Sequence, residues 1–301
     1  MSRRGGAGVE FEGEHMDTAG SAAASGPSDP VLLRVDDGLA RITLNRPERL
    51  NAFDPDLAHA WSEVTTEATS RDDVGAIMLE GAGGSFCAGG DVQAMAAGGV
   101  AGGADISRLA EVINRGIRAL TESSVPVIAA AHGTTAGGGL GILMTSDYAI
   151  VGADSRIGSL YANIGLTPDL SVSAQLARAV GERRALQLVL QARLLSATEA
   201  LEWGLVAEVV SAEDPGDMAA RVRARAEEVA RFWLSGAYRA YGEAKRLIRS
   251  QPSRSFADHL SEEARTIGAM FDTPDAQARI AAFAAGAGAR RPSAPEPQEK
   301  A

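Results

Sequence analysis

The sequence predicts an α/β fold with a helical C-terminal region. Up to about residue 211, short apolar runs typical of buried strands alternate with amphipathic segments of helical period. From about residue 212 to residue 285 the helical period continues without an intervening strand. With 301 residues, of which 45% are hydrophobic, the chain can bury a substantial core. We therefore expect a mixed core at 31–211 and a helical region at 212–285.

Both ends of the chain fall outside this pattern. Residues 1–30 are rich in Gly, Ala and Ser, and residues 286–301 are rich in Pro, Ala and charged side chains. Neither segment can bury enough apolar surface to offset the entropy that is lost on ordering. We expect both segments to be disordered tails.

A hairpin and a helix open the predicted core. Residues 31–35 and 39–44 are β-type runs, and Asp36-Asp37-Gly38 between them is a hairpin turn signal. Asp54 followed by Pro55 supplies an N-cap and a proline at the first helical position. Apolar residues then recur at helical spacing: Leu57, Trp61, Val64 and Ala68. The pattern predicts a helix that begins at Pro55.

Two further strands each lead into a glycine-rich turn. The apolar run at 74–79 precedes the turn 84–91 (GSFCAGGD), and the run at 125–131 precedes the turn 136–141 (AGGGLG). An amphipathic helix is expected between them, with Ile106, Leu109, Ile113, Ile117 and Leu120 on its apolar face. Glycine has no Cβ, so backbone amides in such turns can approach a ligand closely. Two amides that meet at one point would form an oxyanion hole for a thioester carbonyl.

Either turn alone is more simply explained as a tight strand-to-helix connection. The two turns belong, however, to five motifs in which the chain resembles the crotonase (enoyl-CoA hydratase/isomerase) superfamily over roughly residues 31–285. Each motif is weak alone, and their order and spacing carry the resemblance. The motifs are Asn45-Arg46-Pro47 with Asn51-Ala52, residues 86–91 (FCAGGD), residues 136–141 with Asp147, residues 164–169 (IGLTPD) and residues 200–206 (ALEWGLV).

The resemblance implies a crotonase-like spiral of ββα units for the core. It also implies a homotrimer, or a dimer of trimers, assembled through the helical C-terminal region. The substrate would be an acyl-CoA, with coenzyme A entering as part of the substrate and no separate cofactor.

The family pattern also implies the catalytic groups. The backbone amides of Ala88 and Gly138 would form the oxyanion hole, and Asp169 stands where isomerases of the family and 4-chlorobenzoyl-CoA dehalogenase carry a catalytic carboxylate. One carboxylate can take a proton from one carbon and return it to another. Because the reference pKa of Asp is about 3.9, burial beside Leu166 and Leu170 would have to raise it. The local sequence alone favours an N-cap role for Asp169.

Two departures from the family's catalytic pattern reduce the number of activities that the chain could have. Typical hydratases of the family use two glutamates, and this chain has Gly141 and Tyr161 at those positions. The catalytic histidine of the dehalogenase corresponds to Asn114, and its active-site tryptophan to Tyr161. We therefore expect an isomerase with a single catalytic Asp, moving a double bond from the 3- to the 2-position or acting like an epoxyphenylacetyl-CoA isomerase. The alternatives are an atypical hydratase, a dehalogenase-like hydrolase and a non-catalytic acyl-CoA binder.

Further residues are expected at the substrate. The expected substrate-binding residues are Tyr161, Asn114, Gly90, Asp91 and Gly139. The Tyr161 phenol would line the acyl pocket or donate a hydrogen bond, and an aromatic residue that only packs is the alternative.

Three basic residues are expected at coenzyme A. Arg46 and Arg49 lie in a loop that approaches the CoA adenosine and phosphates in the family, and guanidinium groups suit phosphate. Solvated loop arginines are the simpler alternative. Lys245 would reach the same phosphates from a neighbouring subunit.

Composition excludes several other classes. The formal net charge of −10 argues against a nucleic-acid partner. The single cysteine, Cys87, allows no intrachain disulfide and fits a reducing compartment. No apolar run approaches the roughly 18–20 residues that span a membrane, and the four histidines lack metal-ligand spacing. We expect a cytoplasmic protein with no metal and no membrane contact.

Overall fold

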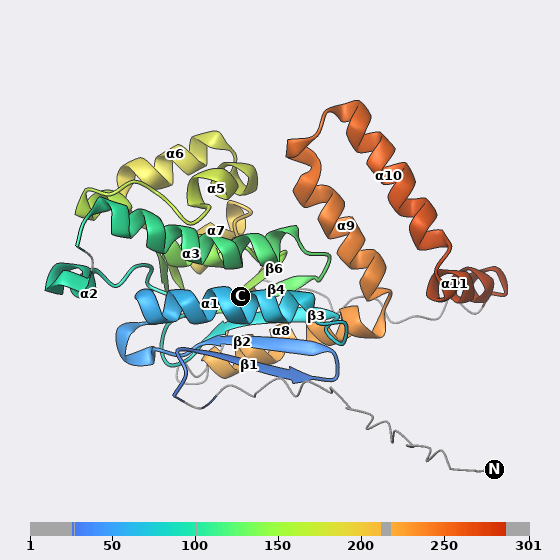
Figure 1. Ribbon diagram of the computed structural model, residues 1–301, viewed down its shortest axis with the longest axis horizontal. Coiled ribbons are helices and arrows are strands. Elements are labelled where there is room, and N and C mark those ends of the chain that lie inside the picture. The colour runs from blue at the N-terminus through green and yellow to red at the C-terminus, as the bar shows by residue number, and fades with distance from the viewer. Residues whose placement is uncertain (1–25, 27, 100, 212–217, 287–301) are drawn as a thin grey trace, which may run out of the picture.

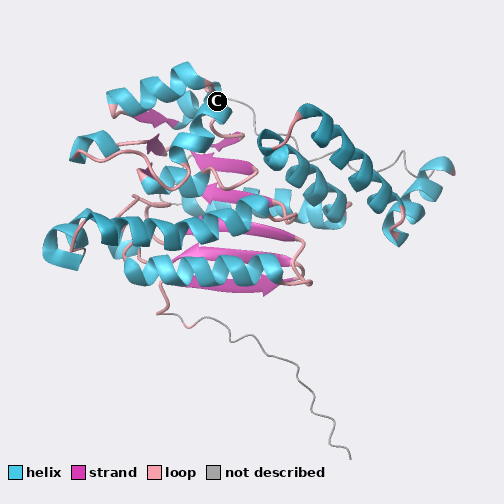
Figure 2. Cartoon of the chain, turned by 45° about the horizontal axis from the view of Figure 1, so that its top comes forward, coloured by secondary structure: helices cyan, strands magenta, loops and turns pink. Residues whose placement is uncertain are grey.

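The computed structural model describes residue 26 and residues 28–99, 101–211 and 218–286. The expected tails at 1–30 and 286–301 lie almost entirely outside these ranges. Within them, a sheet with helices on both faces forms the body, and three helices near the C-terminal end project from it (Figures 1 and 2).

The main sheet has six strands in the order β1-β2-β3-β4-β6-β9. They are β1 (Val31–Asp36), β2 (Leu39–Leu44), β3 (Ala76–Gly81), β4 (Val127–Ala131), β6 (Tyr148–Gly152) and β9 (Glu208–Val210). β1 and β2 are antiparallel, and all other neighbours are parallel. The predicted hairpin is confirmed, and both of its turn residues, Asp37 and Gly38, adopt the positive φ that favours such tight turns.

A second, smaller sheet pairs β5 (Thr134–Ala136), β7 (Arg156–Gly158) and β8 (Leu194–Ser196). β5 and β7 are parallel, whereas β7 and β8 are antiparallel. These strands are not predicted from the sequence, because three residues are too few to show an alternating pattern.

Both faces of the main sheet are buried, as the alternating side chains of β3 show. Its alternate residues Ile77 and Leu79 enter the larger apolar cluster, and Ala76 and Met78 enter the smaller one. The larger cluster lies under α1 (Pro55–Ser70) and α3 (Gly103–Glu122), which pack against each other. The smaller cluster is covered by α8 (Met218–Ser235). A parallel sheet needs this cover on both faces, which explains the continuous apolar runs.

Capping chemistry fixes two helix starts. The Asp54 side chain accepts a hydrogen bond from the Leu57 amide at 2.9 Å, and Pro55 follows, as predicted for α1. Ser196 and Glu199 form a reciprocal capping box at α7. The other short elements are α2 (Val92–Ala94) with the irregular turn η2 (Met95–Gly99), α4 (Gly138–Leu143), α5 (Val172–Val180), α6 (Glu182–Gln191), α7 (Ala197–Glu202) and the 3₁₀ turns η1 (Pro47–Arg49), η3 (Tyr161–Ile164) and η5 (Gln251–Ser253).

The C-terminal region is helical, as predicted, wherever it is described. After α8 come α9 (Tyr238–Ser250), α10 (Phe256–Phe271) and α11 (Pro274–Ala284), which project from the body (Figure 1). Residues 212–217, predicted as part of this region, lie outside the described residues. Phe256, Ile267 and Phe283 are each more than 70% exposed. In the described part of the chain, no helix is both long and apolar enough to cross a membrane.

Candidate active site

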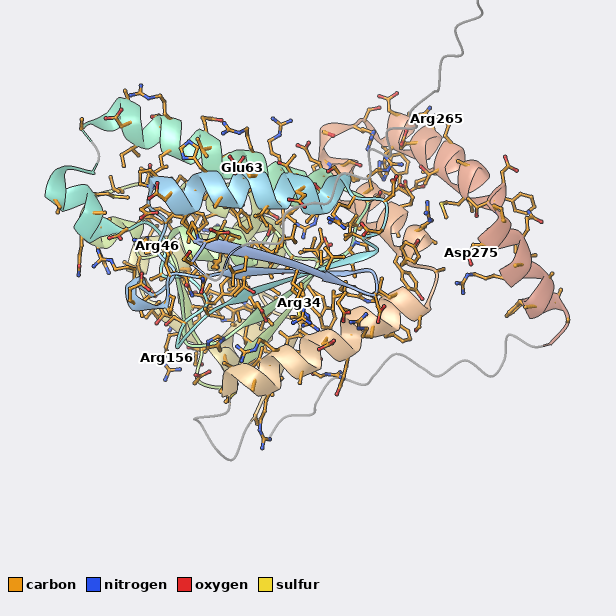
Figure 3. The ribbon with its side chains drawn as sticks, turned by 60° about the horizontal axis from the view of Figure 1, so that its bottom comes forward. Arg34, Arg46, Glu63, Arg156, Arg265 and Asp275 are labelled. Carbon is orange, nitrogen blue, oxygen red and sulfur yellow. The ribbon has the colours of Figure 1, made fainter. Side chains whose placement is uncertain are left out.

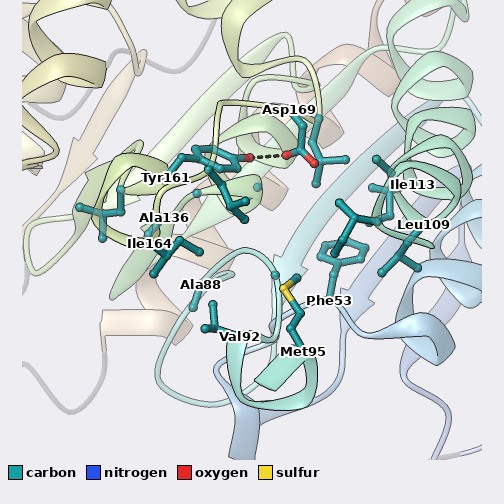
Figure 4. A pocket seen from close by; sticks show the side chains of 18 of the residues that line it. Phe53, Ala88, Val92, Met95, Leu109, Ile113, Ala136, Tyr161, Ile164 and Asp169 are labelled. Carbon is teal, nitrogen blue, oxygen red and sulfur yellow. Dashed lines mark hydrogen bonds between the residues drawn. The ribbon is translucent and has the colours of Figure 1, made fainter. Parts of the chain in front are cut away.

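A cavity of about 280 Å³ opens where the two glycine turns meet α3 and the segment that connects β7 to α5. Its walls are mostly apolar (Figure 4). The lining residues are Phe53, Ala88, Gly90, Val92, Met95, Ile106, Leu109, Ala110, Ile113, Ala136, Gly137, Gly138, Leu160, Tyr161, Asn163, Ile164, Leu166, Asp169 and Leu170. Asp169 and Tyr161 are the titratable side chains in this lining set, so they are the groups available for proton transfer.

These two side chains are directly bonded. The Tyr161 hydroxyl donates a hydrogen bond to Asp169 Oδ1 at 2.6 Å (Figure 4). Burial raises the pKa of Asp169, although the bond from Tyr161 partly opposes this. Burial and the neighbouring Asp169 charge raise the pKa of Tyr161 above its usual value. The pair therefore combines a carboxylate of increased basicity with a phenol that keeps its proton.

Asp169 does not act as a helix N-cap. The N-cap of α5 is Ser171, and the Asp169 carboxylate instead turns toward Tyr161. Leu170 and Ser171 both adopt left-handed backbone angles, with φ of 45° and 69°. Such conformations cost on the order of 1–3 kcal/mol each for residues with a Cβ. The buried Leu170 side chain holds this strained turn in place, and the turn aims Asp169 into the cavity.

Gly141 accommodates the same strained turn. A Cβ on Gly141 would overlap the Leu170 carbonyl oxygen, which is backbone and cannot swing aside. No side chain fits at position 141 while residues 169–171 keep this path. The position that carries a glutamate in typical hydratases is thus closed by the segment that presents Asp169.

The second glycine turn offers an open amide. Gly138 is the first residue of α4, where backbone amides have no partner within the helix. Its amide makes no hydrogen bond to any other described residue, and the residue lines the cavity. The Gly138 amide is therefore open to a ligand oxygen, and its role as an oxyanion donor stays a prediction.

The first glycine turn uses its amide internally. Ala88 lines the cavity, but its amide donates to the Leu50 carbonyl at 3.0 Å. Leu50 and Asn51 both have positive φ, and the buried Asn51 side chain holds this loop by donating to the Ser85 carbonyl. The two turns meet as predicted, because Ala136 donates its amide to the Cys87 carbonyl. Only one of the two expected oxyanion donors is free.

Residues 34–287 match the family model described as enoyl-CoA hydratase/isomerase. The chain belongs to this family. It is 32% identical to the short-chain-enoyl-CoA hydratase of Clostridium acetobutylicum over 84% of this chain and 94% of that one. It is 33% identical to the 1,2-epoxyphenylacetyl-CoA isomerase of Escherichia coli over 63% and 72%. A solved enoyl-CoA hydratase/isomerase from Cupriavidus metallidurans superposes with a TM-score of 0.76 at 28% identity, covering 86% of this chain and 94% of that one. The predicted family and crotonase-like fold are confirmed.

In this member of the enoyl-CoA hydratase/isomerase family, Asp91 has a structural role in the first turn. It does not line the cavity but caps α2 by accepting a bond from the Ala94 amide, and it is 5% exposed. Arg49 donates to both of its carboxylate oxygens, at 3.1 and 2.8 Å, and this hydrogen bonding holds the Asp91 pKa below its usual value. Contact between Asp91 and a substrate stays a prediction that this arrangement does not support.

Arg46 and Arg49, the predicted phosphate ligands, are both paired with acids. Arg46 lies after β2 (Figure 3) and reaches Asp54 at 2.9 Å and Asp91 at 3.4 Å. Arg49, one-third exposed, pairs with Asp91. Their role toward coenzyme A stays a prediction, and any phosphate would compete with these carboxylates.

Lys245 is used inside this chain. Its ammonium is buried and donates to the carbonyls of Leu120 and Val125 at 2.7 and 2.6 Å. It also pairs with Asp147 at 3.1 Å. Its three protons are thus used to attach α9 to the body, and burial lowers its pKa. A role toward the CoA phosphates of a neighbouring subunit stays a prediction that these bonds do not support.

Gly139 and Asn114 also lie outside the cavity lining. A Cβ on Gly139 would overlap the Cys87 carbonyl, so this glycine allows the two turns to pack closely. Asn114 follows Ile113 on α3, and the helical rotation of about 100° per residue turns it away from the cavity that Ile113 lines. Their substrate contact stays a prediction that the cavity does not support, whereas Gly90 does line the cavity.

Most of the apolar lining could not be predicted from the sequence. Phe53, Met95 and, at η3, Leu160 and Ile164 come from three segments that only the fold brings together. The apolar face of α3 was predicted, and it includes Ile106, Leu109 and Ile113. Part of this face lines the cavity instead of the core, so its helical periodicity was the one sequence signal for these lining residues.

Proposed function

We propose that this protein is an enoyl-CoA isomerase that moves a double bond by proton transfer through Asp169. The observation that carries the proposal is the Tyr161–Asp169 pair in a mostly apolar cavity. The closed position at Gly141 supports it, because the carboxylate pair of a typical hydratase has no room there. Burial favours a more basic Asp169, as proton abstraction from carbon requires.

The proposed reaction starts with the thioester oxygen at the Gly138 amide. Asp169 takes a proton from C2, and the negative charge of the resulting dienolate is stabilised by that amide. Return of the proton at C4 completes the shift from the 3- to the 2-enoyl thioester. For Ala88 to act as the second donor, its amide must exchange the Leu50 carbonyl for the thioester oxygen.

The apolar walls favour an uncharged acyl group. The lining set contains no cationic side chain that could pair with a second carboxylate on the substrate. Coenzyme A would enter as part of the substrate and leave with the product. Arg46 and Arg49 remain the proposed phosphate contacts.

A ring-opening isomerisation of the epoxyphenylacetyl-CoA type is the second candidate. It is favoured by the similarity to the Escherichia coli isomerase and by Phe53 and Tyr161 in the cavity walls. A dehalogenase-like hydrolase is not favoured, because Asn114, at the position of its base, does not line the cavity.

A paired assay tests the proposal. The purified protein receives 3-hexenoyl-CoA in one sample and crotonyl-CoA in another, and the enoyl-thioester absorbance is followed. We expect conversion of the first with little hydration of the second. Asp169→Asn should lower the conversion by about 10²–10⁴-fold, while Asn163→Ala, a change on the same wall, should retain it.

Rapid hydration of crotonyl-CoA would contradict the isomerase. Tight CoA-thioester binding in calorimetry, with no turnover of either acyl chain, would favour the non-catalytic binder. Unchanged conversion in Asp169→Asn would exclude Asp169 as the base.

We also propose that α10 and α11 mediate a homotrimer or a dimer of trimers in the cytoplasm. The exposed apolar residues Phe256, Ile267 and Phe283 support an assembly, since a face of this kind is costly in water. Light scattering of the wild type against Ile267→Glu measures the state, and a monomeric wild type would contradict it.

A further inference from the structure

The phenol of Tyr161 lines the cavity and is bonded to the one carboxylate of its lining. Tyr161 belongs to η3, and Asp169 lies in the loop before α5, so the connection from β7 to α5 folds back to bring the two oxygens to 2.6 Å. Both side chains are partly buried and both line the cavity. We infer that Tyr161 is a second catalytic residue, which relays the proton between Asp169 and the far carbon of the substrate. The inference rests on the proposed isomerisation.

The backbone limits what Asp169 can do alone. It precedes two left-handed residues, Leu170 and Ser171, and the Leu170 carbonyl is packed against Gly141. Because this backbone is fixed, movement of the carboxyl toward C4 is limited to rotation of the Asp169 side chain. The neighbouring phenol provides a second oxygen from which a proton can leave.

The hydrogen-bond pattern assigns one role to each oxygen. Asp169 Oδ1 accepts the Tyr161 proton, whereas Oδ2 makes no bond to another residue in the described part of the chain. Oδ2 is therefore the oxygen that takes the proton from C2. A half turn about the Cβ–Cγ bond then brings the new O–H beside the phenol oxygen.

The transfer balances without a co-reactant. Breaking the C2–H bond gives a protonated Asp169 and a dienolate. Tyr161 then gives its hydroxyl proton to C4, which forms the new C–H bond and leaves the double bond between C2 and C3. As that proton leaves, the phenol oxygen takes the proton of Asp169. The carboxylate and the neutral phenol are both restored.

The experiment separates proton removal from proton delivery. Wild type and Tyr161→Phe are incubated with 3-hexenoyl-CoA in D₂O, and NMR follows both deuterium at C2 of the remaining substrate and the formation of product. If Tyr161 relays the proton, Tyr161→Phe should lose at least about 100-fold in product formation and keep C2 exchange within about tenfold of wild type. Asp169→Asn should lose both.

Tyr148→Phe is the matched control, because Tyr148 faces Glu208 outside the cavity lining. It should behave as wild type in both measurements.

The acid limb of the pH–rate profile supplies another readout. Because the Tyr161 hydrogen bond lowers the Asp169 pKa, its removal should move that limb to higher pH.

Three outcomes are distinguishable from the expected one. Equal losses of exchange and product in Tyr161→Phe would make Tyr161 a positioning residue for Asp169 and overturn the relay. No loss in either would make it part of the wall and also overturn the relay. A wild type with neither exchange nor product would instead contradict the proposed isomerase, on which the relay depends.

Discussion

The two glycine-rich turns have similar compositions but use their backbone amides differently. In the turn 84–91, the amides of Phe86, Cys87 and Ala88 all donate to carbonyls of other segments. In the turn 136–141, the Gly138 amide opens α4 and is left free within the described residues. Glycine content therefore predicts close approach of two backbones, whereas the neighbouring chain decides which amides remain for a ligand.

The glycines of the second turn also pack more tightly. Gly139 and Gly141 face the carbonyls of Cys87 and Leu170, where a Cβ would overlap backbone atoms. Gly84, in the first turn, is exposed and has no heavy atom within 4 Å of where its Cβ would be. The first turn makes such a close backbone contact at Gly89, where a Cβ would lie 2.8 Å from the Ala136 carbonyl oxygen. Its other contacts with neighbouring segments are hydrogen bonds and charges.

Removal of the free amide is the strongest test of this contrast. Gly138→Pro lacks the N–H but suits the first position of a helix. Gly138→Ala keeps the N–H. Its Cβ, like that of proline, would lie 2.6 Å from the flexible end of the Leu170 side chain. In steady-state assays we expect kcat of the proline variant to lie roughly 10²–10³-fold below that of the alanine variant. Equal values would show that Gly138 donates nothing to the reaction.

A Cβ at position 141 should have the next largest effect. Gly141→Ala pushes the Leu170 carbonyl, and with it the turn that carries Asp169. We expect a loss of about 1–3 kcal/mol in the free energy of unfolding, as for other overpacked sites. The kcat should fall as well, because Asp169 moves. Urea denaturation and the isomerase assay measure the two effects, and a variant that matches wild type in both would contradict the described path of residues 169–171.

The charge network of the first turn predicts a pH effect. Because hydrogen bonding from Arg49 lowers the Asp91 pKa, this carboxylate stabilises the fold above its unfolded pKa of about 3.9. That stabilisation is lost as the pH falls through the lower folded pKa. Asp91→Asn should cost about 1 kcal/mol at pH 7, with the difference from wild type shrinking below pH 4. A difference that is constant with pH would argue against the ion pair.

Gly84→Ala should have the smallest effect. The position is exposed, its φ lies outside the left-handed region, and its Cβ meets open space. The free energy of unfolding should change by less than about 0.5 kcal/mol and kcat should stay the same. A large loss here would show that the first turn is packed as tightly as the second.

Local chemistry made part of the fold predictable from the sequence. Asp37-Gly38 specifies a tight hairpin turn, and Asp54-Pro55 specifies a helix start, because each signal acts through its own backbone. The family motifs placed Tyr161 and Asp169 at the site, and both line the cavity.

Long-range contacts were not predictable in this way. The carbonyl that accepts the hydrogen bond from the Ala88 amide belongs to Leu50, in a different loop, and no local sequence pattern predicts this bond. The sequence around Lys245 is that of an exposed lysine. Its ammonium is buried beside Asp147 because α9 packs against the end of α3. The bond from Tyr161 to Asp169 likewise depends on the left-handed residues Leu170 and Ser171, which sequence propensity disfavours.

The packing of Leu170 against Gly141 also constrains how this branch of the family could have diverged. Within this backbone, acquiring a glutamate at position 141 by one substitution would displace the turn that presents Asp169 before a second carboxylate could be placed. A carboxylate at position 141 therefore requires the loop at 169–171 to change together with the glycine.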